Sequence, residues 1–379
     1  MIFTCLSRIT RHVDSVFRKS SSTVIFLLLL FLQTLSIQAR EVSPEEALSV
    51  ARRYVRISEQ TQHEVRMRTK ALLQSTPYYI YNDGGGNGFV IVASNDAMGE
   101  VLAYSASGVM DTARLNPEVR FLLQSYRDVY RQLKNNPQLT TQASHAPKPA
   151  DVVLPLIKSR WGQGEPYNKL THYYTGCVAT AMAQIMYYHQ WPLRGQGSNS
   201  YTVNYEGQTR SADFSQSQYA WEQMRPTYTY GSYKKQQEDA VAKLMSDVGI
   251  SVYMQYTPNS SSAQNFAAAQ AFRSYFDYDA AIVTKENEGN AHFLEVIQDE
   301  LRKGFPLYIS GNQRSGASGH AWVADGFDRD GLIHMNFGWD GQADGYYSLA
   351  ALNLSSSGTE FGGRPLSFNK QLLVILAHP

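Results

Sequence analysis

The chain contains only two cysteines in 379 residues, Cys5 and Cys177, and this scarcity limits how it can be held together. Two thiols cannot form a multi-disulfide scaffold, and a structural zinc module needs four Cys or His ligands in paired spacing. The fold must therefore rest on apolar burial, for which this length and a hydrophobic fraction of 43% are ample. Because 34 basic residues stand against 33 acidic ones, the charge offers no footprint for nucleic acid.

The N-terminal segment has the order of a secretory signal peptide. Basic residues up to Lys19 precede an uncharged run at 24–32, and the small residue Ala39 ends the segment. The nine residues of that run are fewer than the roughly 20 that cross a bilayer, although an uncleaved anchor is the alternative. We expect residues 1–39 to be removed on export together with Cys5, which leaves a secreted or surface-held protein with a single thiol.

A polar stretch with three prolines, residues 135–149, divides the rest of the chain. Its composition is typical of an exposed linker that proteases cut. Before it, the pattern predicts a helix over about 44–57, a hairpin with a glycine-rich turn over 78–93, and a second helix from Pro117. After it come one strong helix and then short strands and turns. We expect three parts: the signal peptide at 1–39, a small α+β unit with its linker at 40–147, and a larger domain at 148–379.

Cys177 stands at the predicted start of a helix that Pro192 must end. In the first turn of a helix, unpaired N–H groups and the helix dipole favour an anion. A free thiol has a pKa near 8.5, and a helix start with a nearby imidazolium brings it to about 3.5–7.5. The alternative is a buried cysteine that acts as a small hydrophobe. Because Gly176 precedes it, access to the sulfur is favoured, and we predict a nucleophile.

A cysteine nucleophile needs a base, and nine histidines compete for that role. His189 lies on the same predicted helix, about 18 Å from Cys177 at 1.5 Å per residue, and cannot reach the sulfur. His320 follows a loop of small residues and opens a predicted strand, where nothing bulky would hinder a substrate. It is the best candidate for the base, with a structural histidine as the alternative.

Two amide side chains complete the predicted chemistry. A hairpin could bring Asn336 beside His320, where its side-chain carbonyl would orient the imidazole, and Trp339 could shield that contact from water. Gln163 stands between glycines before the cysteine. Paired with the backbone N–H of Cys177, its amide would make an oxyanion hole with two donors.

Five sequence blocks together resemble a known family. They are WGQGEPYN at 161–168, TGCVATAMAQIM at 175–186, LMSDVGISV at 244–252, GHA at 319–321 and NFGW at 336–339. They are similar to blocks of the streptopain family of secreted bacterial cysteine peptidases. The resemblance covers nearly all of the chain after the signal, and it is weaker ahead of the linker.

The resemblance implies an α+β, papain-like fold with a helical part and an antiparallel, barrel-like sheet part, preceded by a small α+β inhibitory propeptide. It implies that Cys177 is the nucleophile, that His320 is the general base and then the acid, and that Gln163 is an oxyanion donor. It also implies that Ser262 and Gly319 contact the backbone of the substrate. Protein and peptide substrates and the chain's own propeptide are the implied partners.

In the family, a tryptophan-rich segment after the asparagine supports the histidine. Here it reads Asn-Phe-Gly-Trp at 336–339 instead of Asn-Trp-Gly-Trp, so Trp339 and Phe337 are both candidates for shielding the histidine, and Asp340 is an alternative orienting group. The glycine-rich segment 355–363 resembles the mobile active-site loop of the family. Cutting near 145–151 would release the propeptide, and the papain-like resemblance implies selection by an apolar residue next to the cleaved bond.

We expect no cofactor and no metal. The Asp-rich turns at 325–331 and 340–345 lack the spacing and closing glutamate of a calcium-binding EF-hand loop, and hairpin turns explain them equally well. Two alternatives to the peptidase remain open. The same Cys and His pair would serve an acyltransferase or a cell-wall amidase, and a catalytically inactive secreted binding domain would use neither. No nucleic-acid partner is expected, and no membrane after removal of the signal.

Overall fold

The computed structural model describes residues 39–62, 76–136, 139–144, 148–312, 319–356 and 372–379. Residues 1–38 of the predicted signal peptide (1–39), the linker residues 145–147 and most of the predicted loop at 355–363 lie outside these ranges. Residues 40–379 form one compact unit, and this unit is described below. No helix in the described ranges is both long and apolar enough to cross a membrane. The same residues hold no group of three His, Cys, Asp or Glu side chains placed to bind a metal ion.

Among the described residues of 40–136, the N-terminal part contains two α-helices and three strands. Helix α2 (Pro44–Ala51) starts as predicted, with Ser43 and Glu46 in a capping box. It ends sooner than the predicted residue 57, because the chain tightens into bonds to the third residue back, such as Tyr54 N–H to Ala51 O at 2.9 Å. The predicted hairpin is confirmed. Strands β1 (Tyr78–Asn82) and β2 (Phe89–Ala93) pair antiparallel, β3 (Val101–Ser105) pairs with β2, and α4 (Pro117–Asn135) follows.

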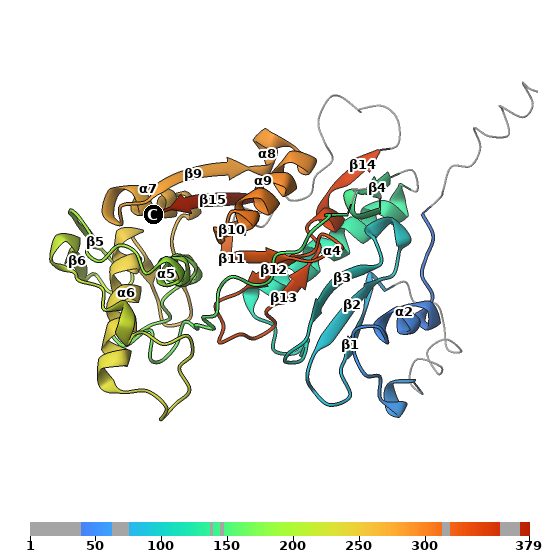
Figure 1. The fold of residues 1–379 in the computed structure, drawn as a ribbon, viewed down its shortest axis with the longest axis horizontal. Helices are drawn as coiled ribbons and strands as arrows, with labels where there is room; N and C mark the ends of the chain where they lie inside the picture. Colours follow the sequence, from blue (N-terminus) through green and yellow to red (C-terminus); the bar gives the residue numbers. More distant parts are fainter. Residues whose placement is uncertain (1–38, 63–75, 137–138, 145–147, 313–318, 357–371) are drawn as a thin grey trace, which may run out of the picture. The chain divides into compact units, whose positions relative to one another are not determined.

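These strands continue into the sheet of the C-terminal part. The large sheet has nine strands in the order β1-β2-β3-β13-β12-β11-β10-β15-β9, and every neighbouring pair is antiparallel. Figure 1 shows β3 next to β13, with β2 and then β1 further out. The strands of the C-terminal part are β9 (Asp279–Thr284), β10 (Leu307–Asn312), β11 (Gly319–Phe327), β12 (Ile333–Asn336), β13 (Gly345–Tyr347) and β15 (Leu373–His378).

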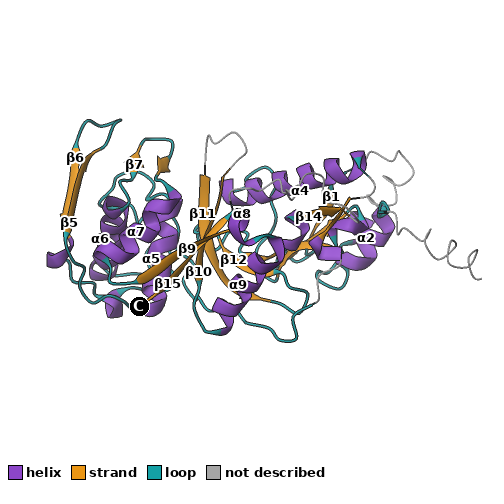
Figure 2. Cartoon of the chain, turned by 90° about the horizontal axis from the view of Figure 1, so that it is seen from above, coloured by secondary structure: helices purple, strands orange, loops and turns teal. Residues whose placement is uncertain are grey.

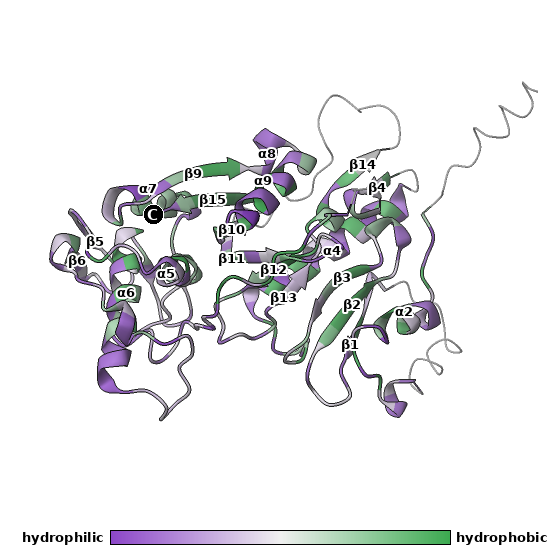
Figure 3. Cartoon of the chain, viewed as in Figure 1, coloured by the Kyte–Doolittle hydropathy of each residue, from purple (hydrophilic) through white to green (hydrophobic). Residues whose placement is uncertain are grey.

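Helices α5, α6 and α7 are grouped at one end of the sheet, away from α2 and α4 (Figure 2). Their apolar faces form a core with β10, β11 and β15. Figure 3 shows the apolar colour concentrated on strands such as β2 and β3. The helices of the C-terminal part are α5 (Cys177–His189), α6 (Lys235–Ser251), α7 (Asn265–Tyr275), α8 (Lys285–Glu288) and α9 (Asn290–Arg302). Short two-stranded pairs are β5 (Ser198–Thr202) with β6 (Thr209–Asp213) and β7 (Gln255–Tyr256) with β8 (Ser261–Ser262).

Part of the stretch predicted as an exposed linker is a strand. β4 (Leu139–Thr141) pairs antiparallel with β14 (Leu354–Ser356), and both Leu139 and Thr141 are buried. The hydroxyl of Thr141 donates to the carbonyl of Ala97 over 2.7 Å. A threonine-rich stretch satisfies its backbone in a strand as readily as in water, so its composition alone did not reveal the pairing.

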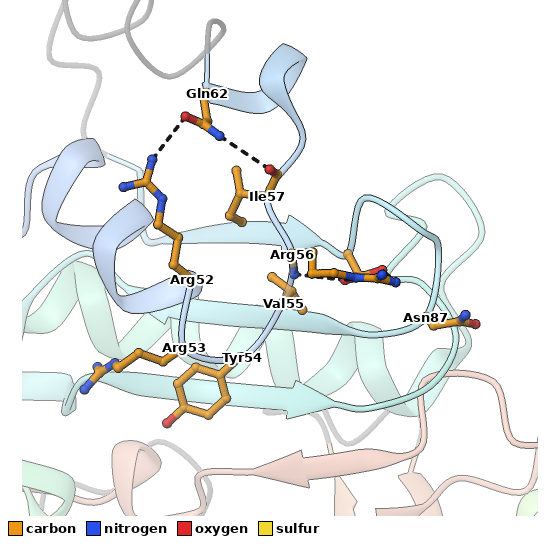
Figure 4. A pocket seen from close by; sticks show the side chains of 9 residues that line it. Arg52, Arg53, Tyr54, Val55, Arg56, Ile57, Gln62 and Asn87 are labelled. Carbon is orange, nitrogen blue, oxygen red and sulfur yellow. Dashed lines mark hydrogen bonds and ion pairs between the residues drawn. The ribbon is translucent and has the colours of Figure 1, made fainter.

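A shallow cavity of about 500 Å³ lies on the N-terminal part (Figure 4). It is lined by residues 52–57 and by Gln62, Asp83 and Asn87. Its arginines have partners: Arg56 pairs with Asp83, and Arg52 donates to the side chain of Gln62. None of the predicted site residues lines this cavity.

Candidate active site

Cys177 is the first residue of α5, which ends at His189 before Pro192, as the sequence predicts. Gly176 adopts a φ of +88°, and a β carbon there would lie 2.6 Å from the Cε atom of Met254. Only glycine fits both the backbone angle and the space. The thiol is free and partly buried. The local chain therefore fixes the sulfur at a helix start.

The electrostatics of the thiol differ from the prediction. Burial raises the pKa of Cys177 to about 12, and the negative charge of Glu118 acts in the same direction. Backbone N–H groups, those of Ala321 first and of Val178 next, act against this rise. The helix start thus favours the thiolate as expected, but burial outweighs it. The predicted lowering is wrong for this form of the chain, and its thiol is protonated at neutral pH.

His320 is the second residue of β11. Side chains alternate between the two faces of a strand, and the next residue, Ala321, belongs to the core around α5. His320 therefore projects from the other face, where its ring centroid is 6.2 Å from that of Phe121 on α4. Burial lowers the pKa of the imidazole, and the charge of Arg120 acts in the same direction. Within the described ranges, no hydrogen bond or ion pair joins His320 to Cys177.

The N-terminal part places a carboxyl group at this site. Glu118 of α4 has 1% of its surface exposed, and its Oε2 accepts a hydrogen bond of 2.7 Å from Nε1 of Trp339. Its Oε1 is 3.9 Å from Nδ1 of His320. Burial raises the pKa of Glu118 to about 7. Asn116 caps α4 by accepting from the N–H of Val119 at 2.8 Å, which fixes the helix start over the site.

Asn336 does not face His320. The predicted hairpin forms, but its register places Asn336 opposite Val323, an odd number of residues from His320. The two side chains therefore leave opposite faces of the sheet. Instead, Nδ2 of Asn336 donates to the carbonyl of Ser159 at 2.7 Å, and Oδ1 accepts from Nε2 of Gln184 at 2.9 Å. The prediction that Asn336 orients the imidazole is wrong for this form of the chain.

Gln163 lies beside the start of α5. Its carbonyl oxygen accepts from the N–H of Thr175 at 3.0 Å, two residues before Cys177. The side chain is 4% exposed, and its Nε2 is buried without a hydrogen-bond partner within the described ranges. A buried donor without a partner costs about 1–3 kcal/mol, so such a group needs an explanation. A carbonyl oxygen bound next to Cys177 would provide one.

The two predicted substrate contacts lie at the end of β8 and at the start of β11. Ser262 is exposed in β8, next to Ser261, whose hydroxyl donates to the carbonyl of Tyr174 at 2.6 Å. That bond ties the β8 strand to the loop before Cys177. Gly319 is exposed at the start of β11, one residue before the histidine. Both residues thus flank the segments that carry the predicted pair.

Of the two alternative supports for the histidine, Trp339 is held by Glu118, as described above. Asp340 lies against Gly162, where a β carbon would come within 2.4 Å of Oδ2, and its N–H donates to the carbonyl of Trp161 at 3.3 Å. Burial raises the pKa of Asp340. Asp340 therefore packs on the segment that carries Gln163. No hydrogen bond or ion pair between the described residues links it to His320.

Sequence reasoning missed two residues of this region. Glu118 gives no local signal, because a glutamate in the first turn of a helix is ordinary. Gln184 does give one: it is a fully buried amide in an otherwise apolar stretch of α5. A polar side chain in such a stretch needs a partner, and that need could have drawn attention to it.

Comparison with known proteins agrees with this geometry. A model of the "Peptidase C10 family" matches residues 161–347, and one of the "Spi protease inhibitor" matches residues 39–130. The chain is 36% identical to streptopain of Streptococcus pyogenes over 325 residues. This match covers 78% of this chain and 79% of streptopain. The chain belongs to the peptidase C10 family.

Two solved structures of Prevotella intermedia proteins extend the comparison. A prointerpain A fragment is 33% identical, with a TM-score of 0.68, and the match covers 80% of this chain and 96% of that one. Active interpain A, a cysteine protease, is 36% identical, with a TM-score of 0.53, and covers 60% of this chain and 97% of that one. The proenzyme thus matches more of this chain than the active enzyme does.

The predicted fold, enzyme class and inhibitory segment are therefore confirmed. This member of the peptidase C10 family is a cysteine-type endopeptidase made as a zymogen, with a papain-like fold preceded by an α+β propeptide. The propeptide acts as an intramolecular inhibitor. Its helix α4 supplies the physical means, because it buries Glu118 and Phe121 against the face of β11 that carries His320.

Proposed function

We propose that release of the propeptide produces an endopeptidase in which Cys177 is the nucleophile, His320 the base and then the acid, and Gln163 an oxyanion donor. One observation carries the proposal. Nε2 of Gln163 is buried without a hydrogen-bond partner within the described ranges, and the backbone of Gln163 is bonded to the loop before Cys177. An unpaired buried donor lowers stability, and an oxyanion that forms only during the reaction would be the acceptor for which this donor is kept free.

The proposed reaction has two steps. His320 takes the proton of the Cys177 thiol, and the sulfur attacks the carbonyl carbon of the peptide bond. The carbonyl electrons move to the oxygen, which accepts hydrogen bonds from Nε2 of Gln163 and the N–H of Cys177. His320 then gives its proton to the leaving nitrogen as the carbon–nitrogen bond breaks. Water, deprotonated by His320, attacks the thioester, and the acid product leaves with the thiol restored.

The zymogen is inactive for two reasons, which are effects of the propeptide on Cys177 and on His320. Burial and the charge of Glu118 keep the thiol of Cys177 protonated, and His320 lies on the face covered by α4. When α4 leaves, water reaches the sulfur and Trp339 loses its carboxylate partner. We propose that the start of β11 then rearranges so that the imidazole of His320 reaches Cys177, and that Trp339 shields the imidazole from water. Cutting near 145–151 would begin this release.

The substrates we propose are extended segments of proteins and peptides. Ser262 and Gly319 would bind the backbone of the substrate on either side of the reacting sulfur, and an apolar side chain next to the cleaved bond would select the site. We also propose that the chain is exported by the segment 1–39 and acts outside the cell or at its surface.

The deciding experiment compares Cys177→Ala with the wild-type precursor. The wild-type chain should be clipped within the linker and should then digest denatured protein, and a thiol-directed epoxide should label Cys177. Cys177→Ala should stay at full length and should not digest protein. His320→Ala should behave in the same way, whereas His292→Ala, which changes an exposed histidine of α9, should mature normally. Undiminished maturation of Cys177→Ala would end the proposal.

An amine acceptor separates hydrolysis from acyl transfer. The mature enzyme is given a peptide substrate together with a labelled primary amine, and both products are measured. We expect the free acid to dominate. Incorporation of the amine without hydrolysis would favour the acyltransferase alternative.

A further inference from the structure

Gln184 occupies a position that the reaction described above does not use. It lies seven residues after Cys177 on α5, about two helical turns and therefore on the same face. The side chain is fully buried. Its Oε1 accepts from the hydroxyl of Ser159 at 2.8 Å and from the N–H of Trp161 at 3.3 Å. Its Nε2 donates to Oδ1 of Asn336 at 2.9 Å.

Asn336 closes this network from the other side. Its Nδ2 donates to the carbonyl of Ser159 at 2.7 Å and to Oε1 of Gln184 at 3.2 Å. Its Oδ1 accepts a second hydrogen bond, from the N–H of Gly338 at 3.1 Å. The amide pair Gln184–Asn336 thus uses its donors and acceptors on one another and on two backbone segments. It connects helix α5, the chain at 159–161 and the end of β12.

Each of these three segments leads to a proposed active-site group. Helix α5 begins with Cys177, the segment 159–161 runs into Gln163 two residues later, and the chain after β12 carries Trp339. The chain after β12 also packs closely on α5. A β carbon at Gly338 would lie 2.8 Å from Cγ2 of Thr180, so the backbone approaches the helix as near as glycine allows. The amide pair lies where the three segments meet.

Apolar side chains would fill this space at a lower cost in free energy. Burying primary amides is favourable only when their hydrogen bonds are made, and well-packed apolar groups are often as stable. What hydrogen bonds add is a defined distance and direction between the backbones that they join. In this place, the joined backbones carry the two donors proposed for the oxyanion.

We propose that Gln184, together with Asn336, is a positioning residue that sets the amide of Gln163 against the backbone N–H of Cys177. It acts on the transition state through Gln163 and does not bind the substrate. The inference rests on the proposed function of Gln163. It assigns Asn336 to the support of the oxyanion hole and not to the orientation of the imidazole.

The test is a double-mutant cycle in the mature enzyme, with active sites counted by the thiol-directed epoxide. Gln184→Met keeps the volume and removes the hydrogen bonds, and we expect kcat to fall about 10- to 100-fold with KM within about twofold. Gln163→Ala should lower kcat about 100-fold or more. Because Gln184 acts through Gln163, the double variant should lie within about twofold of Gln163→Ala alone.

A matched control separates positioning from loss of stability. Asn199 is a buried amide in β5 that donates to the carbonyl of Ile250 at 2.8 Å, away from this network. Asn199→Ala should lower the unfolding temperature and leave kcat unchanged. If Asn199→Ala lowered kcat as much as Gln184→Met, the loss would reflect a softened core and the proposal would be overturned.

Gln184→Glu provides a second variant, with a pH readout. A protonated carboxyl group can donate to Oδ1 of Asn336 as the amide does, and an ionised one cannot. The kcat of this variant relative to wild type should therefore rise as the pH falls. A ratio that is flat or falls on acidification would contradict the proposal.

The outcomes also separate this inference from the proposed function. The positioning role would be overturned if the losses in kcat of the two single variants multiplied in the double variant. It would also be overturned if Gln184→Met folded and kept the wild-type kcat. Either result would leave Gln163 as an oxyanion donor. Wild-type kcat in Gln163→Ala would overturn both.

Discussion

The buried carboxyl group of Glu118 makes the stability of the zymogen depend on pH in a direction that can be calculated. Burial raises the pKa of Glu118 from its ordinary 4.5 to about 7. Each unit of difference in pKa between the folded and the unfolded chain changes the free energy of unfolding by about 1.4 kcal/mol, so this shift corresponds to about 3 kcal/mol. Below pH 4.5 the group is protonated in both the folded and the unfolded chain, so the stability is fully present. Between pH 4.5 and 7, Glu118 is ionised in the unfolded chain but still protonated in the folded one, and the free energy of unfolding falls by about 3 kcal/mol.

Glu118→Gln removes this pH dependence and keeps the interaction with Trp339, because the glutamine oxygen accepts from the indole N–H. We expect the variant and the wild-type chain to be equally stable at pH 4.5 and the variant to be about 3 kcal/mol more stable at pH 8. The comparison is made in the Cys177→Ala background, which prevents self-cleavage. Urea unfolding, followed by tryptophan fluorescence, gives the free energy at each pH.

The same pair of proteins is then compared with His320→Asn added to both. Because burial, and not the imidazole, raises the pKa of Glu118, the difference at pH 8 should persist. A difference that does not change with pH would refute the reasoning. So would a variant that is less stable than wild type at pH 8, since that result would mean that an ionised Glu118 is stabilised by a charged His320.

Two further substitutions test the local geometry. Gly176→Ala forces a β carbon into a backbone with φ of +88° and within 2.6 Å of Met254, so it should lower the unfolding free energy by more than about 1 kcal/mol in urea titration. A variant as stable as wild type would contradict this account. Tyr104→Phe removes the hydrogen bond of 2.8 Å from the hydroxyl to Asp328, which holds β3 to the C-terminal part. Loss of this hydrogen bond should weaken the attachment of β3 by about 1 kcal/mol, so conversion of the precursor should be severalfold faster on a gel time course. An unchanged rate would count against that role.

The sequence was most informative where local rules decide the structure. Cys177 begins its helix as predicted because glycine before it and proline after it set the ends, and the hairpin at β1 and β2 follows from its glycine-rich turn. The role considered for Asn336 failed because strand register is set by pairing across the sheet. A spacing that allows a hairpin does not decide which face a side chain leaves.

The contribution of the N-terminal part to the site was not predictable for a related reason. Glu118 and Phe121 reach His320 through contacts between segments that are far apart in the chain, among them the pairing of β3 with β13 and the hydrogen bond from Tyr126 to Ser348. The high pKa of Cys177 has the same origin, since it arises from burial and from Glu118 and not from the helix on which the cysteine stands. Gln163, by contrast, was predicted from its glycine neighbours and its place before the cysteine, and its role stays a prediction.

The pairing of β3 with β13 is the narrowest junction in the large sheet. Only two residue pairs join these strands, Tyr104 with Tyr346 and Ala103 with Tyr347, whereas five pairs join β1 to β2. Few residue pairs of the sheet therefore have to separate at this junction when the propeptide leaves. Strand β13 has three residues, and a sheet edge of that length offers a poor template for pairing with another chain. Release of the propeptide can thus remove three of the nine strands of the large sheet without leaving the enzyme an edge that invites aggregation.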